Sequence, residues 1–264
     1  MTKVPDRLYK FRDLGDNTRK LIEGRQLYLN SVTKFNDPFE FRFRGQMDEE
    51  PDPEQWKSWI NLADLTEEQK THLLALSMAE VARVIGVTSK QFRQQLEQQC
   101  GVFCLCQDAD NLLLWAHYAN SHKGICLEFD TSVAPLNADI HEVIYQTDLP
   151  VMSLPSVDFE TFSDQVLLGK SPHWKYEREW RLVKNNLTPN DRTLTYPPEA
   201  LTGVILGCNF PDSERATLNA WVAASGARPK IHRARRSPTE YKVDIKLEAN
   251  ETLLYLFNGV PIAD

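Results

Sequence analysis

The chain has 264 residues, of which 42% are hydrophobic and 25% are charged, and its formal net charge is -7. This composition is typical of a globular protein that can bury a sizeable core. The acidic balance argues against an extensive nucleic-acid-binding surface, which normally needs a basic face, but it leaves room for a local basic patch. No apolar run reaches the roughly 20 residues that cross a bilayer, so we expect no membrane partner.

The five cysteines indicate a reducing environment. Their number is odd, and Cys104, Cys106 and Cys126 lie in apolar runs, so we predict reduced and mostly buried thiols in a cytoplasmic protein. The pair at 104 and 106 lacks the two-to-four-residue spacing of zinc ligands and has no matching second pair. We therefore expect no metal site.

Alternating and apolar runs predict strands along most of the chain, and capped apolar stripes predict helices between them. In the first half we expect a strand at 8–12, a helix at 18–24, and strands at 26–31, 39–44 and 101–106. In the second half we expect a helix at 112–121 capped by Asn111, strands at 124–130 and 142–146, a helix at 160–170, strands at 178–184 and 203–207, a helix at 213–225, and strands at 230–236 and 241–248.

Residues 54–100 have a helical pattern. Thr66 with Gln69, and Thr88 with Gln91, each have the spacing of a capping box, and apolar residues recur at helical intervals. We predict a helical insertion at about 54–100 within a single α+β domain that covers residues 1–264.

The stretch HWKYEREWR, residues 173–181, interleaves three aromatic residues with six ionisable ones. A helix would pair opposite charges four positions apart, but the aromatic and β-branched content of the second half favours a strand. On a strand, Glu177 and Glu179 would have Cα atoms roughly 6.5–7 Å apart on one side, so both could reach a single ligand. Their repulsion must then be offset by Lys175, Arg181 or a ligand. The alternative interpretation is a solvated strand face with ion pairs.

Two other segments carry polar side chains that could face a ligand. Asn36 and Asp37 belong to the turn signal FNDPFE, which predicts either a rigid edge of a site or only a tight turn between strands. Lys10 and Arg12 share one face of the strand at 8–12. They could supply cations to an anionic ligand or form a solvated edge.

Aromatic residues crowd the helix at 112–121 and its exit. Trp115 and Tyr118 lie three residues apart and so share one side of the helix, and His122 follows shortly after. A lone histidine in such a place is most often structural. Taken together, the polar clusters predict one pocket with a common set of lining residues. These residues are Lys10, Arg12, Asn36, Asp37, Tyr118 and Glu179.

The order of several segments resembles a bacterial family of unknown function, DUF2971. The segments are LYKFR, LYLNSVTKFNDPFE, LLLWAHYANSHKGICLEF, KSPHWKYEREWR and VILG. The resemblance covers most of the chain, and residues 45–100 and the C-terminal strands are the least typical. The family name implies no activity.

A more distant similarity is to ADP-ribosyltransferases, which implies a mixed, mostly antiparallel split sheet and NAD as the substrate. Lys10 or Arg12 would match the early cation of that fold, and Cys104-Leu105-Cys106 would stand where it has Ser-x-Ser. Glu177-Arg178-Glu179 would match its E-x-E motif, which makes both glutamates the implied catalytic residues. The implied NAD-binding residues are Lys10, Arg12, Asn36, Asp37, Trp115, Tyr118, His122 and Arg181.

The implied chemistry agrees with general principles. Cleavage of the nicotinamide–ribose bond passes through an oxocarbenium-like state, which a nearby carboxylate stabilises. The acceptor would be a macromolecule or water, and a role in phage defence or as a toxin would fit. Two other classes of protein stay open: a non-catalytic nucleotide- or protein-binding module, and a metal-dependent hydrolase with a carboxylate ligand set. That set would be Asp37, Glu40, Glu177 and Glu179.

Overall fold

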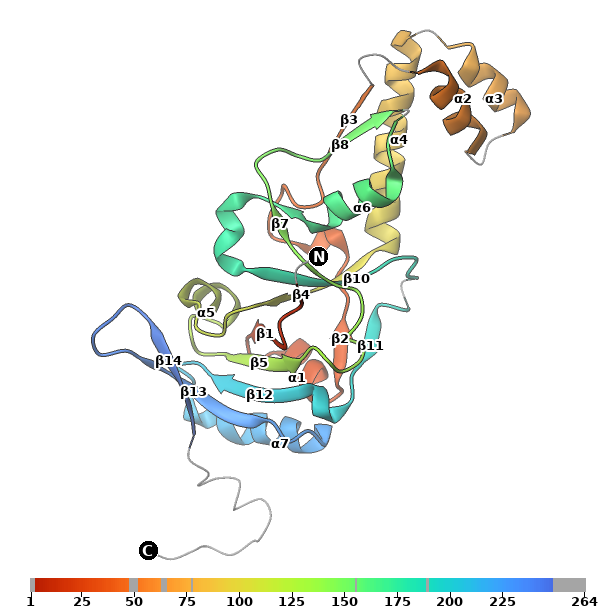
Figure 1. The fold of residues 1–264 in the computed structure, drawn as a ribbon. Coiled ribbons are helices and arrows are strands. Elements are labelled where there is room, and N and C mark those ends of the chain that lie inside the picture. Colours follow the sequence, from red (N-terminus) through yellow and green to blue (C-terminus); the bar gives the residue numbers. More distant parts are fainter. Residues whose placement is uncertain are drawn as a thin grey trace, which may run out of the picture. The chain divides into compact units, whose positions relative to one another are not determined.

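Figure 1 shows a computed structural model of the chain, which describes residues 3–47, 52–62, 66–76, 78–154, 156–188 and 190–248. The chain divides into two compact units. Unit 1 comprises Met1–Val4, Tyr28–Cys104 and Ala138–Leu194, and unit 2 comprises Pro5–Leu27, Leu105–Asn137 and Thr195–Asp264. Each unit contains both helices and strands, so the predicted α+β class is confirmed.

Unit 2 is built on a mixed, mostly antiparallel sheet. Its strands are β1 (Arg7–Arg12), β5 (Ile125–Asp130), β12 (Leu201–Leu206), β13 (Lys230–Arg236) and β14 (Val243–Leu247). The hydrogen-bonded order is β14-β13-β12-β5-β1, in which β12 and β13 run parallel and the other neighbours run antiparallel. β5 is covered on both faces, because neighbouring side chains of a strand point to opposite faces and those at 125, 126, 127 and 129 all have no exposed surface.

The helices of unit 2 are short. They are α1 (Asp16–Ile22), α5 (Leu112–Tyr118) and α7 (Arg215–Ser225), with the 3-10 turns η3 (Pro198–Ala200) and η4 (Asp212–Glu214). Asn111 caps α5 as predicted, because its side-chain oxygen accepts from two backbone N–H groups of the first turn at 3.0 and 3.2 Å. The helix ends at Tyr118, three residues before the predicted end, since Asn120, Ser121 and His122 all have left-handed φ angles.

Unit 1 contains short strand pairs and the longest helices. Its strands are β3 (Arg44–Met47), β6 (Ile140–Glu142), β7 (Ile144–Tyr145), β8 (Val151–Leu154), β9 (Gly169–Lys170) and β10 (Glu179–Lys184). Its helices are η1 (Val32–Lys34), α2 (Pro53–Leu62), α3 (Glu67–Leu74), α4 (Met78–Gln99), α6 (Phe159–Leu168) and η2 (Pro172–Glu177). β3 pairs with β8 and β7 pairs with β9 in parallel, whereas β10 pairs with β6 antiparallel.

Three further strands contain residues of both units: β2 (Gln26–Tyr28), β4 (Gly101–Cys106) and β11 (Thr193–Thr195). In unit 1, β4 lies next to β10, and in unit 2 its last residue, Cys106, pairs with Tyr9 of β1. The GVFCLC run is almost completely buried, as its apolar sequence predicts.

The predicted insertion consists of helices in the structure. Thr66 caps α3 with the predicted capping box, in which its hydroxyl accepts from the Gln69 backbone at 3.2 Å and the Gln69 side chain accepts from the Thr66 backbone at 2.8 Å. The second signature, at Thr88 and Gln91, lies inside α4 and starts no helix. A helix that contains no proline and contacts β3 along its side can continue through such a signature. Figure 1 shows α2 and α3 side by side in this segment.

Arg192 holds the C-terminal end of α4. Its side chain is buried, and its guanidinium donates to the carbonyl oxygens of Cys100 at 2.9 Å and Gln98 at 2.7 Å, with longer bonds to Glu97 and Leu29. The last carbonyl groups of a helix have no partner within the helix and carry partial negative charge. One arginine therefore satisfies several of them and neutralises the helix end.

The predicted strand at 39–44 is wrong. Residues 37–41 form a turn in which the Glu40 N–H donates to the Asp37 carbonyl at 3.2 Å and the Phe39 N–H donates to the Asp37 carboxylate at 2.8 Å. Phe41 has a φ of 56°, so the chain reverses where the alternating pattern predicted extension. Phe39 is exposed and Phe41 is buried, and the strand β3 begins only at Arg44.

The structure describes all five cysteines and joins none of them in a disulfide bond. Among the residues that the structure describes, no helix is long and apolar enough to cross a membrane.

Candidate active site

The two glutamates of the E-x-E motif occupy different local structures. Glu177 ends η2, whose first turn is capped by the Ser171 hydroxyl, and Glu179 begins β10. Arg178 between them has a φ of 43° and a ψ of 53°, which turns the chain from one element into the other. The strand predicted to begin at 178 is therefore confirmed from Glu179 onward, and the extended conformation considered for 173–177 is wrong. Pro172 at the first position of η2 favours the helical turn, because its ring fixes φ.

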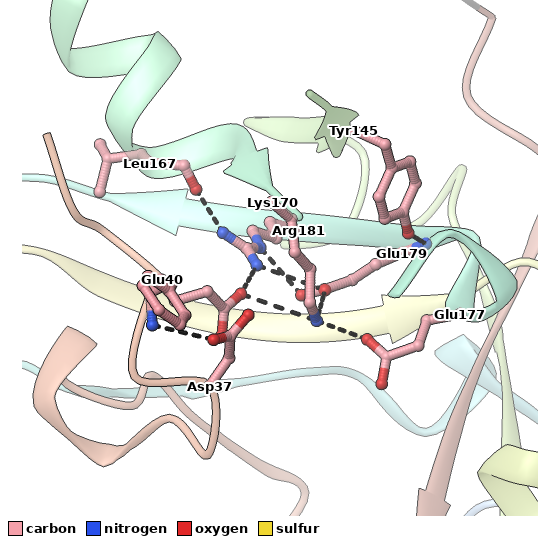
Figure 2. A network of polar contacts seen from close by, with 9 residues as sticks. Asp37, Glu40, Tyr145, Leu167, Lys170, Glu177, Glu179 and Arg181 are labelled. Carbon is pink, nitrogen blue, oxygen red and sulfur yellow. Dashed lines mark hydrogen bonds and ion pairs between the residues drawn. The ribbon is translucent and has the colours of Figure 1, made fainter. Parts of the chain in front are cut away.

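The two carboxylates nevertheless reach one cation. Lys170 on β9 donates from Nζ to Glu177 Oε2 at 2.5 Å and to Glu179 Oε2 at 2.7 Å, as Figure 2 shows. All three side chains are at most 5% exposed. The sequence predicted that a cation or a ligand must offset the repulsion between these glutamates, and the structure assigns that role to Lys170 rather than to Lys175, which is exposed.

Arg181 extends the cluster on the same face of β10 as Glu179, since alternate residues of a strand share a face. Its Nε donates to Glu179 Oε1 at 2.8 Å, its Nη1 donates to the Leu167 carbonyl at 2.6 Å, and its Nη2 donates to Glu40 Oε1. Arg181 has no exposed surface. Figure 2 shows Glu40, from the turn at 37–41, entering the cluster from the opposite side to Glu177. We call Glu40, Lys170, Glu177, Glu179 and Arg181 the charge cluster.

Aromatic rings cover both cations of the charge cluster. The Arg181 guanidinium lies 5.1 Å from the ring centre of Phe41 and 5.7 Å from that of Phe35. The Lys170 ammonium lies 5.1 Å from the ring of Trp174. Such contacts add electrostatic attraction and exclude water. The charges of the cluster therefore interact in a medium much less screening than water.

The environment separates the pKa values of the carboxyl groups. Burial alone would raise the pKa of Glu179, but Arg181 and Lys170 outweigh it and hold that pKa well below its usual range. Burial would lower the pKa of Lys170, but Glu179, Glu40 and Glu177 raise it instead. Burial dominates at Glu40 and raises its pKa despite the nearby Arg181. Glu179 and Lys170 are therefore held charged, and Glu40 takes a proton more readily than an exposed glutamate does.

Glu40 also carries a buried oxygen that lacks a hydrogen bond. Its Oε2 atom has no partner among the described residues, whereas its Oε1 atom contacts Arg181. A buried polar atom without a partner is costly unless it is protonated or bound. This agrees with the raised pKa, because a protonated Glu40 would leave the remaining two carboxylates balanced by two cations.

A metal-dependent hydrolase would need several carboxylates around one metal ion. In this structure three glutamates converge instead on the ammonium group of Lys170. Lys170 Nζ lies 3.7 Å from Glu40 Oε1, in addition to its bonds to Glu177 and Glu179. Within the described ranges, no group of three or more histidine, cysteine, aspartate or glutamate side chains is arranged to hold a metal ion. The charge cluster therefore supplies its own cation at the point where a metal would bind. Asp37, the fourth predicted ligand, is buried, and its carboxylate supports the turn at 37–41.

In unit 2, β1 separates two of the predicted NAD-binding residues. The Phe11 ring contacts Trp115 edge-to-face at 5.0 Å, whereas Arg12 Nε donates to the Thr18 hydroxyl of α1 at 3.1 Å. Because consecutive side chains of a strand point to opposite faces, Arg12 and Trp115 lie on opposite sides of β1. Trp115 is also completely buried, and its indole N–H donates to the Ala109 carbonyl at 2.8 Å. The structure therefore does not bring these two residues to one ligand.

The other predicted residues have mixed surroundings. Tyr118 is 36% exposed, and Asn36 is exposed directly before the turn at 37–41 of unit 1. His122 stacks near Trp115, and burial followed by the charge of Arg236 lowers its pKa. Lys10 is half-buried on β1. Lys10 and Tyr118 belong to unit 2, whereas Asn36, Asp37 and Glu179 belong to unit 1, so the single shared pocket stays a prediction.

Sequence reasoning missed Lys170 as a member of the cluster and considered Glu40 only as a metal ligand. Lys170 follows an apolar helix in a segment without charge alternation, and its partner Glu177 lies seven residues away on another element. The rings of Trp174 and Tyr176 are half-buried, and Trp174 lies against Lys170, which the alternation of aromatic and charged residues in 173–181 does not indicate. The sequence contains one weak signal for a role of Lys170 in the cluster. This lysine directly precedes Ser171 and Pro172, which predict the start of a helical turn.

The fold and the charge cluster define an α+β protein with a buried, charge-balanced group of acids and bases at the start of one strand. The family model described as "Protein of unknown function (DUF2971)" matches residues 114–182, which confirms the predicted resemblance for that segment of the chain. This segment includes Lys170, Glu177, Glu179 and Arg181, and Glu40 lies outside it. The search of curated proteins found no match, and the search of solved structures found none either.

Proposed function

We propose that the charge cluster is the catalytic centre of an ADP-ribosyltransferase-like enzyme or NAD glycohydrolase. One observation carries the proposal: two glutamates of an E-x-E motif meet at one buried ammonium, next to half-buried aromatic rings. The family match is compatible with this chemistry but says nothing about it.

Glu179 would stabilise the positive charge that develops on the ribose as the bond to nicotinamide breaks. Its two oxygens are held by Arg181 and Lys170, so the carboxylate is ionised and fixed in position. A fixed charge needs no reorganisation during the reaction, which is the main source of electrostatic catalysis. Nicotinamide would leave with the bonding electron pair and become neutral.

Glu177 would orient the acceptor. Glu177 lies at the end of the short 3-10 helix η2 rather than within the sheet, and it shares Lys170 with Glu179. The acceptor oxygen or nitrogen would add to the ribose carbon and pass its proton to the Glu177 carboxylate. Trp174 and Tyr176, whose ring centres lie 6.0 Å apart, would contact the nicotinamide ring.

The direct test is NAD consumption with release of nicotinamide, followed by chromatography. Wild-type protein should release nicotinamide, Glu179→Gln should not, and Glu142→Gln should match the wild type, because Glu142 is exposed on β6. Addition of candidate macromolecules would show whether ADP-ribose is transferred to an acceptor or to water. Wild-type protein that neither binds nor cleaves NAD would remove the proposal.

A structural role is the second candidate, and the complete pairing of Arg181 favours it. In that case the cluster only holds η2, β10 and the turn at 37–41 together. Unfolding measurements would then show large losses in the cluster variants, and no nucleotide would be consumed. A nucleotide that raises the melting temperature without being consumed would instead support the binding module predicted as an alternative.

The setting of this activity is also part of the proposal. Free cysteines fit a cytoplasmic protein, and NAD cleavage in the cytoplasm would suit phage defence or a toxin. Expression of wild-type and Glu179→Gln protein in bacteria, with cellular NAD as the readout, tests that setting.

A further inference from the structure

The hairpin of β13 and β14 is strongly basic although the whole chain is acidic. Residues 228–248 contain seven lysines and arginines and three acids, whereas the formal net charge of the chain is -7. β13 alone reads KIHRARR. Positive charge concentrated on one ribbon of an acidic protein points to an anionic partner at that place.

The loop of this hairpin is ordered and presents one aromatic ring. The Ser237 hydroxyl accepts from the backbone of Thr239 at 3.4 Å and of Glu240 at 3.3 Å, and the Ser237 N–H donates to the Lys242 carbonyl at 3.0 Å. Tyr241 is 102% exposed relative to a reference residue, so its ring buries nothing. Figure 1 shows the loop between β13 and β14 projecting beyond the other strands of unit 2.

Arg235 and Arg236, which lie beside the loop, differ from Arg233 in their ion pairing. Arg233 is neutralised by Glu248 at 2.6 Å and lies 3.5 Å from Asp212. Arg235 is exposed and has no ion pair among the described residues, and Arg236 donates to the uncharged Asn209 side chain at 2.7 Å. Positive charge that makes no ion pair within the described part of the chain therefore lies near the loop, with Asp244 as the cross-strand neighbour of Arg235.

We propose that the β13–β14 hairpin binds single-stranded nucleic acid, with Tyr241 stacking on an unpaired base and with Arg235 and Arg236, which project from opposite faces of β13, contacting phosphates on either side of that base. Base stacking on an aromatic side chain tolerates any sequence, and arginine suits phosphate geometry. A duplex keeps its base faces stacked inside, so an exposed ring on a loop favours a single strand. The proposal uses residues of unit 2 alone and does not rest on the NAD chemistry proposed for unit 1.

The test is fluorescence anisotropy of the full chain with labelled 20-nucleotide single-stranded RNA, single-stranded DNA and the matching DNA duplex. Tyr241→Ala should weaken single-strand binding about tenfold and leave its salt dependence unchanged, since it removes stacking and no charge. The double variant Arg235→Gln/Arg236→Gln should lower the slope of log affinity against log salt by about 1.4, the value for two phosphate contacts on a single strand. The matched control is Arg83→Gln, an exposed arginine of α4 in unit 1, which should change nothing.

The outcomes separate the proposal from non-specific attraction. Tighter binding of either single strand than of the duplex, with loss on Tyr241→Ala, supports it, and the RNA and DNA arms show which polymer is preferred. No binding by the wild type, equal binding of duplex and single strand, or full retention of binding in Tyr241→Ala overturns it. An equal loss in Arg83→Gln also overturns it. Unchanged melting temperatures of the variants ensure that a loss of binding reflects the hairpin surface, because Tyr241 has no buried contacts to lose.

Discussion

The charge cluster of unit 1 and the basic hairpin of unit 2 use charged residues in opposite ways. In the cluster, Arg181 has no exposed surface and contacts two carboxylates and a carbonyl. In the hairpin, Arg235 is exposed and has no ion pair within the described part of the chain. Burial makes a charge expensive to leave unpaired, whereas exposure leaves it available to a partner. The same residue type thus serves internal organisation in one unit and, as proposed, recognition in the other.

The largest effect should come from Arg181→Met. The substitution keeps apolar volume but leaves Glu179 and Glu40 facing fewer cations in a buried site, and losing one partner of a buried pair costs roughly 3–5 kcal/mol. Urea unfolding should show this loss. The matched control is Arg235→Met on the exposed hairpin, which should change the free energy of unfolding by about 0.5 kcal/mol or less. Equal effects of the two variants would contradict the comparison.

Glu179→Gln should reduce NAD cleavage roughly 10²-fold or more, because it removes the charge and keeps the size of the side chain. The substitution should also lower stability, because the Glu179 carboxylate is buried between Lys170 and Arg181. Rates should therefore be normalised to the folded fraction at each temperature. A Glu179→Gln protein with wild-type activity would remove Glu179 from the catalytic assignment.

Glu177→Gln should reduce activity less than Glu179→Gln. Glu177 bonds to Lys170 from the end of η2, whereas Glu179 lies at the start of β10 and is held by both Lys170 and Arg181. A larger loss in Glu177→Gln would reverse the proposed roles. Comparing water with a macromolecular acceptor sharpens the test, because a residue that orients the acceptor should affect transfer and hydrolysis unequally.

The stability of the cluster should depend on pH with two opposite contributions. Glu179 has a lowered pKa, so its stabilisation is present above the unfolded value of about 4.3 and is lost as the pH falls through its folded pKa. Glu40 has a raised pKa, so its favourable contribution is present below the unfolded value and is lost as the pH rises through its folded pKa.

Melting temperatures between pH 3 and 8 would resolve these contributions. Glu179→Gln should flatten the loss of stability in acid, and Glu40→Gln should gain stability relative to the wild type as the pH rises from about 4 to 7. Parallel curves for the wild type and both variants would show that neither group changes its pKa on folding.

The smallest effect is expected for Lys242→Gln in the hairpin. Lys242 pairs with Glu240 and lies 3.9 Å from Asp244, but it is 50% exposed, and exposed pairs contribute about 0–1 kcal/mol. The melting temperature should stay within about 2 °C of the wild type, which a thermal scan would measure. A clear drop would mean that the hairpin is stabilised by its charges in the same way as the cluster.

The sequence alone determined the parts of the molecule that local chemistry controls. Apolar runs predicted β4 and β5, the Thr66–Gln69 capping box predicted the start of α3, and Asn111 predicted the start of α5. These features depend on propensities and on hydrogen bonds between residues a few positions apart. The same kind of reasoning failed at 39–44, where a turn held by Asp37 replaced the strand that the alternating pattern predicted.

Only the tertiary structure decided which charges meet. The sequence predicted that Glu177 and Glu179 could share a partner, but Lys170 and Glu40 entered the cluster from other elements, and Arg181 bonds to Glu40 across 141 positions of the chain. Local patterns carry no information on such pairs, because their energy appears only when distant elements exclude water around them. The placement of Arg12 and Trp115 on opposite faces of β1 was decided in the same way, by the helices that pack on each face.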